Sequence, residues 1–123
     1  MIDPLRPMLH ARDLDETIRF YTDRLGFSLD ATWSPTPDGA AVWCALSHGA
    51  AQLMFTSGDE DEPSLTGRLY CYPADVDGYH DEVVERGVVP IVAPFDTEYG
   101  MREFSLVDPN GYVVTFGRGR GED

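Results

Sequence analysis

The chain has 123 residues, of which 42% are hydrophobic and 25% charged, and its formal net charge is −13. This length fits one domain and this composition is typical of a folded globular protein, which argues against a disordered chain. The acidic balance argues against nucleic acid and anionic membranes as partners, because both require a basic surface. Residues 1–8 contain no apolar stretch like that of a signal peptide, so we expect a cytoplasmic protein.

The first half of the chain is predicted to form a strand, a helix and three further strands. Residues 8–11 form the first strand, and Asp13 is placed to cap the helix, with Glu16 three residues later as in a capping box. Apolar residues at helical spacing continue as far as Gly26, which is expected to end the helix. The remaining strands are expected at residues 27–33, 40–46 and 50–56, with residues 47–49 as a hairpin loop.

The second half repeats this order. A strand at residues 69–72 precedes a helix that either Asp75 or Asp77 caps and that Gly87 ends. Three strands follow at residues 88–93, 101–107 and 112–117, and the sequence Asp-Pro-Asn-Gly at 108–111 is a strong turn signal between the last two. The similar spacing of the two halves indicates a duplicated supersecondary unit.

These elements predict an α+β fold of two tandem βαβββ modules within a single domain. The first module covers about residues 4–57 and the second about residues 66–118, with the acidic segment 57–63 as a solvated linker. Neither module can bury both faces of its small sheet alone. We therefore expect an open, curved sheet that encloses a cleft, with the helices on the outside and a ligand site on the inner face.

Three segments resemble a known family. Residues 7–14 (PMLHARDL) and 20–27 (FYTDRLGF) resemble the opening of vicinal-oxygen-chelate modules, and residues 99–111 (YGMREFSLVDPNG) resemble their closing strand and turn. The likeness to this glyoxalase, bleomycin-resistance and dioxygenase superfamily covers nearly the whole chain, and the bleomycin-resistance branch is the most similar. It is a strong indication of fold and a weak one of function, because the fold hosts several enzyme classes and drug-binding proteins.

The resemblance also identifies the positions at which enzymes of the superfamily bind a divalent metal, usually through His, Glu or Gln. In this sequence those positions hold Arg6, Arg68, Thr115 and, on the fourth strand, Met54, with Gln52 two residues away on the same face. Arginine stays protonated and repels a cation, and the other side chains are poor ligands. We therefore expect no metal and no cofactor.

Side-chain alternation along the strands predicts the lining of the cleft. The residues expected to contact a ligand are His10, Trp43, Met54, Tyr70, Tyr72, Tyr99, Arg102 and Thr115. Tyr99 is included because an aromatic residue contacts the ligand at this place in the drug-binding relatives. An aromatic cleft fits a planar ring through stacking and a cation through the π-face. Aromatic residues at alternate strand positions more often belong to a packed core, which is the favoured alternative for Trp43 and Tyr72 and an equal one for Tyr70 and Tyr99.

The other polar residues point to no catalytic centre. His48 and His80 are expected on the surface, in a hairpin loop and a helix respectively. Arg102 and Glu103 are adjacent and must point to opposite faces of their strand, where a structural ion pair or cap is the simpler role. No nucleophile has a base at hand, and the sequence has no phosphate-binding glycine loop.

The sequence thus favours a metal-free protein that binds and sequesters a cationic or aromatic small molecule, as bleomycin-resistance proteins do. The resemblance implies a homodimer with the ligand between subunits. The alternative is a metal-dependent lyase or isomerase of the glyoxalase kind, or a ring-cleaving dioxygenase. A third reading is a metabolite-binding member of a larger complex. Whether the chain catalyses a reaction is left open by its residues.

Overall fold

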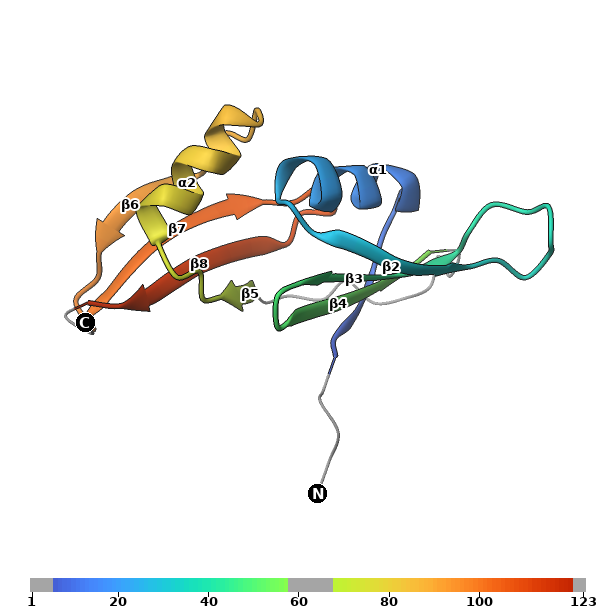
Figure 1. Ribbon diagram of the computed structural model, residues 1–123, viewed down its shortest axis with the longest axis horizontal. Coiled ribbons are helices and arrows are strands. Elements are labelled where there is room, and N and C mark those ends of the chain that lie inside the picture. Colours follow the sequence, from blue (N-terminus) through green and yellow to red (C-terminus); the bar gives the residue numbers. More distant parts are fainter. Residues whose placement is uncertain (1–5, 58–67, 121–123) are drawn as a thin grey trace, which may run out of the picture. The chain divides into compact units, whose positions relative to one another are not determined.

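The computed structural model describes residues 6–57 and 68–120, and the chain divides into two compact units, Met1–Leu65 and Thr66–Asp123. Figure 1 shows the helices and strands of both units. The predicted acidic linker lies outside the described residues except for Ser57. The single-domain arrangement therefore stays a prediction, while the order of elements within each unit can be compared with the sequence.

The first unit consists of one four-stranded sheet and one helical segment. Its elements are β1 (Met8–His10), α1 (Leu14–Arg19), a π-helical turn η1 (Phe20–Arg24), β2 (Ser28–Trp33), β3 (Trp43–His48) and β4 (Ala51–Thr56). The strand order is β1-β4-β3-β2, in which β1 and β4 are parallel and the other pairs are antiparallel. A parallel pair of first and last strands is the closure that a βαβββ module requires.

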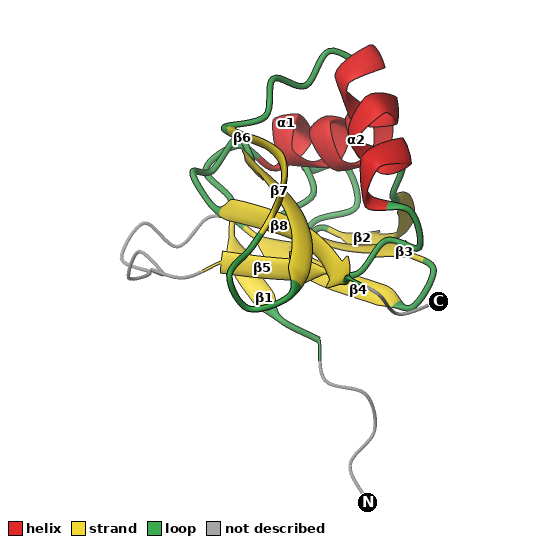
Figure 2. Cartoon of the chain, turned by 90° about the vertical axis from the view of Figure 1, so that its left-hand side faces the viewer, coloured by secondary structure: helices red, strands yellow, loops and turns green. Residues whose placement is uncertain are grey.

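The helical segment of this unit begins and ends where the sequence predicts. The Asp13 side chain accepts a hydrogen bond from the Glu16 backbone N–H, and Gly26 adopts a positive φ of 83° just after the last turn. Tyr21 and Leu25 point into the core and are fully buried, together with Phe55 on β4. The segment therefore covers one face of the sheet and leaves the other face without a helix (Figure 2).

The second unit has the same plan. Its elements are β5 (Arg68–Cys71), α2 (Val76–Glu85), β6 (Val92–Asp96), β7 (Met101–Val107) and β8 (Val113–Gly119), with strand order β5-β8-β7-β6. Asp75 caps α2 by accepting from the Gly78 N–H, and Gly87 follows the helix with a φ of 95°. Of the two caps that the sequence left open, Asp75 is therefore the one used.

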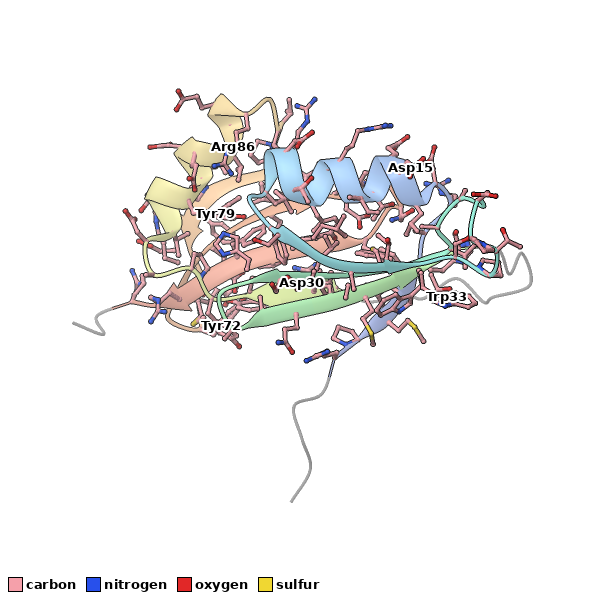
Figure 3. The ribbon with its side chains drawn as sticks, turned by 45° about the vertical axis from the view of Figure 1, so that its right-hand side comes forward. Asp15, Asp30, Trp33, Tyr72, Tyr79 and Arg86 are labelled. Atoms are coloured by element: carbon pink, nitrogen blue, oxygen red, sulfur yellow. The ribbon has the colours of Figure 1, made fainter. Side chains whose placement is uncertain are left out.

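An aromatic cluster fixes α2 to this sheet. The rings of Phe104 on β7 and Phe116 on β8 stack with centroids 5.0 Å apart, and Tyr79 of α2 lies 5.0 Å from Phe116. Figure 3 labels Tyr79 between the helix and the strands. The neighbouring residues Val83, Leu106 and Val114 are fully buried on the same side. The core of this unit therefore lies between α2 and one face of the sheet.

The predicted α+β class and the tandem βαβββ modules are confirmed, although some boundaries differ. The edge strand β6 begins at Val92 and not at residue 88, because Pro90 lacks the N–H group that a regular ladder needs. The first hairpin is tighter than expected, since His48 pairs with Ala51 and leaves a two-residue turn. Across the described residues, no helix is long and apolar enough to cross a membrane.

Candidate functional site

The face of the second sheet that points away from α2 carries most of the polar side chains buried in this unit. We call it the tyrosine face, and it is made of Arg68, Tyr70, Tyr72, Tyr99, Glu103, Ser105, Thr115 and Gly117. Strand alternation places the members on β5, β7 and β8 opposite Phe104 and Phe116, which pack against the helix. Tyr72 and Tyr99 lie outside these strands and join the face through their contacts with Tyr70 and Glu103. Tyr72, labelled in Figure 3, lies on the side of the strands away from α2.

A buried carboxylate occupies the centre of the tyrosine face. Glu103 is only 4% exposed, and its Oε2 accepts a hydrogen bond of 2.6 Å from the Tyr70 hydroxyl. The Tyr99 hydroxyl donates to both carboxylate oxygens, at 3.0 Å and 2.9 Å. No described residue forms an ion pair with Glu103, so two neutral hydroxyls replace the hydration that the carboxylate loses on burial.

The carboxylate in turn keeps both tyrosines protonated. Burial and the hydrogen bond to Glu103 raise the pKa of Tyr70 well above its usual range. The hydrogen bond to Glu103 is also the main cause of the raised pKa of Tyr99. A tyrosinate beside Glu103 would bring two negative charges together, so both hydroxyls remain donors and the three side chains form a fixed group.

A glycine makes room for this group. A Cβ on Gly117 of β8 would lie 2.1 Å from the Tyr70 hydroxyl oxygen and 2.9 Å from Cγ of Glu103. Gly117 is absent from the residues with positive φ, so its backbone conformation does not require glycine. The missing side chain is required instead by the close approach of Tyr70 to the strand.

Beside this group lies a short row of polar side chains. The Arg68 guanidinium donates through Nη1 to Oγ1 of Thr115 at 3.1 Å, and Thr115 is 2.9 Å from the Ser105 hydroxyl. Thr115 is fully buried and Arg68 is exposed. The rings of Tyr70 and Tyr72 lie 5.0 Å apart at 49°, and the Tyr72 side is largely open to solvent. The tyrosine face thus combines exposed aromatic surface with a fixed cation.

The first unit has an equivalent face on the side of its sheet away from α1. Register places Met8 beside Met54, His10 beside Thr56 and Trp43 beside Thr56, so three residues predicted to contact a ligand share this face. Arg6, just before β1, donates through Nε to the Gln52 amide oxygen at 2.6 Å. Unlike the tyrosine face, this surface shows no buried carboxylate among its described residues.

The structure separates one predicted contact from the others. Arg102 points to the side of β7 opposite Glu103, where its guanidinium pairs with Asp77 of α2 at 3.0 Å and with Asp96 of β6 at 3.2 Å. It therefore ties the helix to the edge strand, which matches the structural role that the sequence also allowed. Tyr70, Tyr72, Tyr99 and Thr115 do share one face, although their contact with a ligand stays a prediction.

Sequence reasoning missed three members of the tyrosine face. Adjacent Arg102 and Glu103 carry no signal for which one points inward, so Glu103 was left without a site role. Ser105 lies on the inward side of a strand whose boundaries were predicted correctly, and alternation from Glu103 would have found it. Gly117 had a usable signal, because a glycine inside a strand often marks a close approach.

The comparisons with known proteins identify the family. Residues 4–116 match the family model described as the Glyoxalase/Bleomycin resistance protein/Dioxygenase superfamily. The chain belongs to this superfamily. No curated protein matches the sequence. The resemblance stated from the sequence is therefore confirmed at the level of the superfamily, whereas the bleomycin-resistance branch remains a prediction.

Solved structures of the superfamily share the fold at low sequence identity. TioX from Micromonospora sp. ML1 has a TM-score of 0.79 at 20% identity, with 95% of this chain and 98% of that chain covered. A glyoxalase-related enzyme from Clostridium phytofermentans gives 0.79 at 19% identity, covering 97% and 96%. A superfamily member from Alicyclobacillus acidocaldarius gives 0.73 at 24% identity, covering 95% and 91%. At these identities the likeness shows the fold alone.

The positions that the resemblance equates with the superfamily's metal ligands hold residues that do not fit a metal. The register is the same in both units, since Met8 pairs with Met54 two residues after Arg6, and Tyr70 pairs with Thr115 two residues after Arg68. The equivalent positions thus hold an arginine in each unit, and each guanidinium donates to a neutral oxygen. A metal ion binds to atoms that offer a lone pair, whereas both guanidinium groups present N–H protons and a positive charge. Residues 6–57 and 68–120 also contain no group of three or more His, Cys, Asp or Glu side chains suited to a metal.

Proposed function

We propose that this protein binds and sequesters a small planar or cationic molecule without a metal, in the manner of bleomycin-resistance proteins. The observation that carries the proposal is the tyrosine face, where the side chains of Tyr72 and Tyr99 are 67% and 71% exposed. They lie beside the Glu103 carboxylate, which hydrogen bonds from Tyr70 and Tyr99 hold in place. Exposed aromatic rings on a rigid support are typical of surfaces that bind ligands.

The hydrogen bonds and ring contacts that hold these tyrosines reduce the side-chain entropy that is lost when a ligand binds. Tyr99 is held by its bonds to Glu103, and the Tyr72 ring lies against Tyr70, which is itself held by Glu103. Rings that are already ordered lose little side-chain entropy when a ligand stacks on them. Each aromatic contact is worth about 0.5–1.5 kcal/mol beyond the area that it buries.

The same features argue against a metal-dependent lyase, isomerase or dioxygenase. Such an enzyme would need the superfamily's metal positions to supply ligands, whereas Arg68 and Arg6 stand there with their guanidinium groups bonded to Thr115 and Gln52. We propose in addition that the protein works as a cytoplasmic homodimer, the state that the resemblance implies. Sedimentation velocity on the purified chain tests the dimer.

Calorimetric titration with three naphthalene probes tests the binding function. The probes are 2-naphthoate, 2-naphthamide and 2-(aminomethyl)naphthalene, which share one ring system and differ in charge. We expect at least one to bind chelator-treated protein near one equivalent per chain. Tyr72→Ala should weaken binding, whereas the matched control Tyr72→Phe keeps the ring and should not, since the exposed Tyr72 hydroxyl forms no hydrogen bond with a described residue.

Two results would contradict the proposal. One is the absence of heat with all three probes at millimolar protein and ligand. The other is binding that appears only after Ni²⁺, Zn²⁺, Mn²⁺ or Fe²⁺ is added, together with a rise in melting temperature on adding that ion. The second result would return the chain to the metalloenzymes of the superfamily.

A further inference from the structure

Arg68 is a cation on the tyrosine face that forms no ion pair with an acidic side chain among residues 6–57 and 68–120. Among the described residues, its guanidinium forms one hydrogen bond, to the neutral Thr115 hydroxyl, and no ion pair. The chain has 22 acidic and nine basic residues, so acidic partners are abundant. Arg86, Arg102 and Arg120 each pair with a carboxylate. An exposed guanidinium at a ligand-facing position therefore keeps its capacity to bind an anion.

The geometry leaves donors available for that purpose. A guanidinium has five N–H groups in a planar fork, and the bond from Nη1 to Thr115 uses one of them. The same bond anchors the head group, because Thr115 is fully buried and is itself bonded to Ser105. Arg68 also acts on Tyr99, whose pKa its charge lowers against the larger raising effect of Glu103. The Arg68 guanidinium and the exposed Tyr99 ring therefore lie close enough to interact electrostatically.

We propose that Arg68 binds an oxyanion of the ligand, so that the natural ligand is a planar aromatic acid. This inference rests on the proposed function and narrows it, since it assigns the ring to Tyr72 and Tyr99 and the acidic group to Arg68. A carboxylate, sulfonate or phosphate can accept two parallel N–H bonds from a guanidinium, a geometry that a neutral or cationic group lacks.

The charges nearby do not oppose this assignment. Glu103 is the acidic group of the tyrosine face, and its oxygens already accept from the Tyr70 hydroxyl and, in a bifurcated bond, from the Tyr99 hydroxyl. The net charge of −13 includes the four consecutive acids at 59–62, which lie outside the described residues. Exposed charges are screened beyond about 8 Å at physiological ionic strength, whereas an ion pair at Arg68 acts at contact distance.

The three naphthalene probes test the inference directly. We expect 2-naphthoate to bind more tightly than the nearly isosteric 2-naphthamide, and 2-(aminomethyl)naphthalene to bind most weakly. Arg68→Gln should raise the Kd of 2-naphthoate about tenfold or more, the size of a lost charge-assisted contact, and leave the Kd of 2-naphthamide within about twofold. The matched control is Arg118→Gln, which removes the same charge from a residue that donates to the Pro73 carbonyl on the other side of β8.

Each outcome separates the two proposals. If no probe binds, the proposed function fails and the inference fails with it. If the amide or the amine binds as tightly as the acid, or if Arg68→Gln and Arg118→Gln weaken 2-naphthoate equally, the binding function stands and the anion site is wrong. Circular dichroism of Arg68→Gln shows that a loss of affinity is not a loss of fold, which is expected to persist because Arg68 is exposed.

Discussion

Replacing Gly117 by alanine tests whether the Tyr70–Glu103–Tyr99 group is held as tightly as its geometry indicates. The new methyl carbon would stand 2.1 Å from the Tyr70 hydroxyl oxygen, far inside van der Waals contact. The hydroxyl would have to retreat by about 1 Å, and a donor–acceptor distance near 3.6 Å is no longer a hydrogen bond. The 2.6 Å bond to Glu103 would therefore be lost.

The expected loss of stability follows from three contributions. A hydrogen bond to a charged group is worth about 1.5–3 kcal/mol, and overpacking a closed space costs about 1–3 kcal/mol. Alanine offsets about 0.4–1 kcal/mol of this by restricting the unfolded chain, since the Gly117 backbone does not need a positive φ. Glu103 also keeps its two bonds from Tyr99. We expect a net destabilisation of about 2 kcal/mol.

Urea unfolding of four proteins measures this loss and its origin. They are the wild type, Gly117→Ala, Tyr70→Phe and the double variant. Because the phenylalanine has no hydroxyl to displace, Gly117→Ala should cost less in the Tyr70→Phe background, with a coupling energy of about 1 kcal/mol or more. Stability of Gly117→Ala within about 0.5 kcal/mol of the wild type, or strictly additive effects, would refute the close approach on which the site depends.

Two further predictions concern the same unit. Asp108→Ala should lower the free energy of unfolding by about 1–3 kcal/mol, because the buried Asp108 carboxylate accepts from the N–H groups of Asn110 and Tyr112; Asp108→Asn keeps an acceptor and should cost clearly less, and equal costs would exclude this role. Burial raises the pKa of the Cys71 thiol to about 11, so its thiolate forms only at high pH. In a Cys44→Ala variant, the alkylation rate with iodoacetamide should still be rising at pH 10, whereas a plateau near pH 9 would contradict the burial.

Local signals in the sequence were sufficient for the fold. The caps at Asp13 and Asp75 and the glycines that end both helical segments act through hydrogen bonds within a few residues, so their pattern can be read directly. The boundaries of β7 were predicted correctly for a similar reason, because the Asp-Pro-Asn-Gly turn stops it. Edge strand β6 begins later than predicted, since the apolar residues 88–91 favour a strand whereas Pro90 cannot donate to a ladder.

The site was only partly predictable, because its decisive contacts are not local. Alternation identified Tyr70, Tyr72 and Thr115 as sharing a face, and register now places Tyr70 beside Thr115. The bond between Tyr70 and Glu103 joins residues 33 positions apart, and no pattern in the sequence indicates it. Arg102 was expected among the ligand contacts, and in the structure Asp77 and Asp96 hold its guanidinium on the helix side of the sheet.

The parallel pairing of first and last strands has a consequence for how the chain folds. In each unit the first strand in the sequence pairs only with the last one. In the first unit, for example, residues 8–10 pair with residues 54–56, so this ladder cannot form before the last strand is present. This closure is the most distant pairing in the unit, and distant pairings are slow to form. All four strands of the first unit precede residue 57, however, so its sheet can close while the ribosome is still making the second. The first unit would then be folded before synthesis ends, and the rate at which the whole chain folds would depend on how quickly β8 pairs with β5.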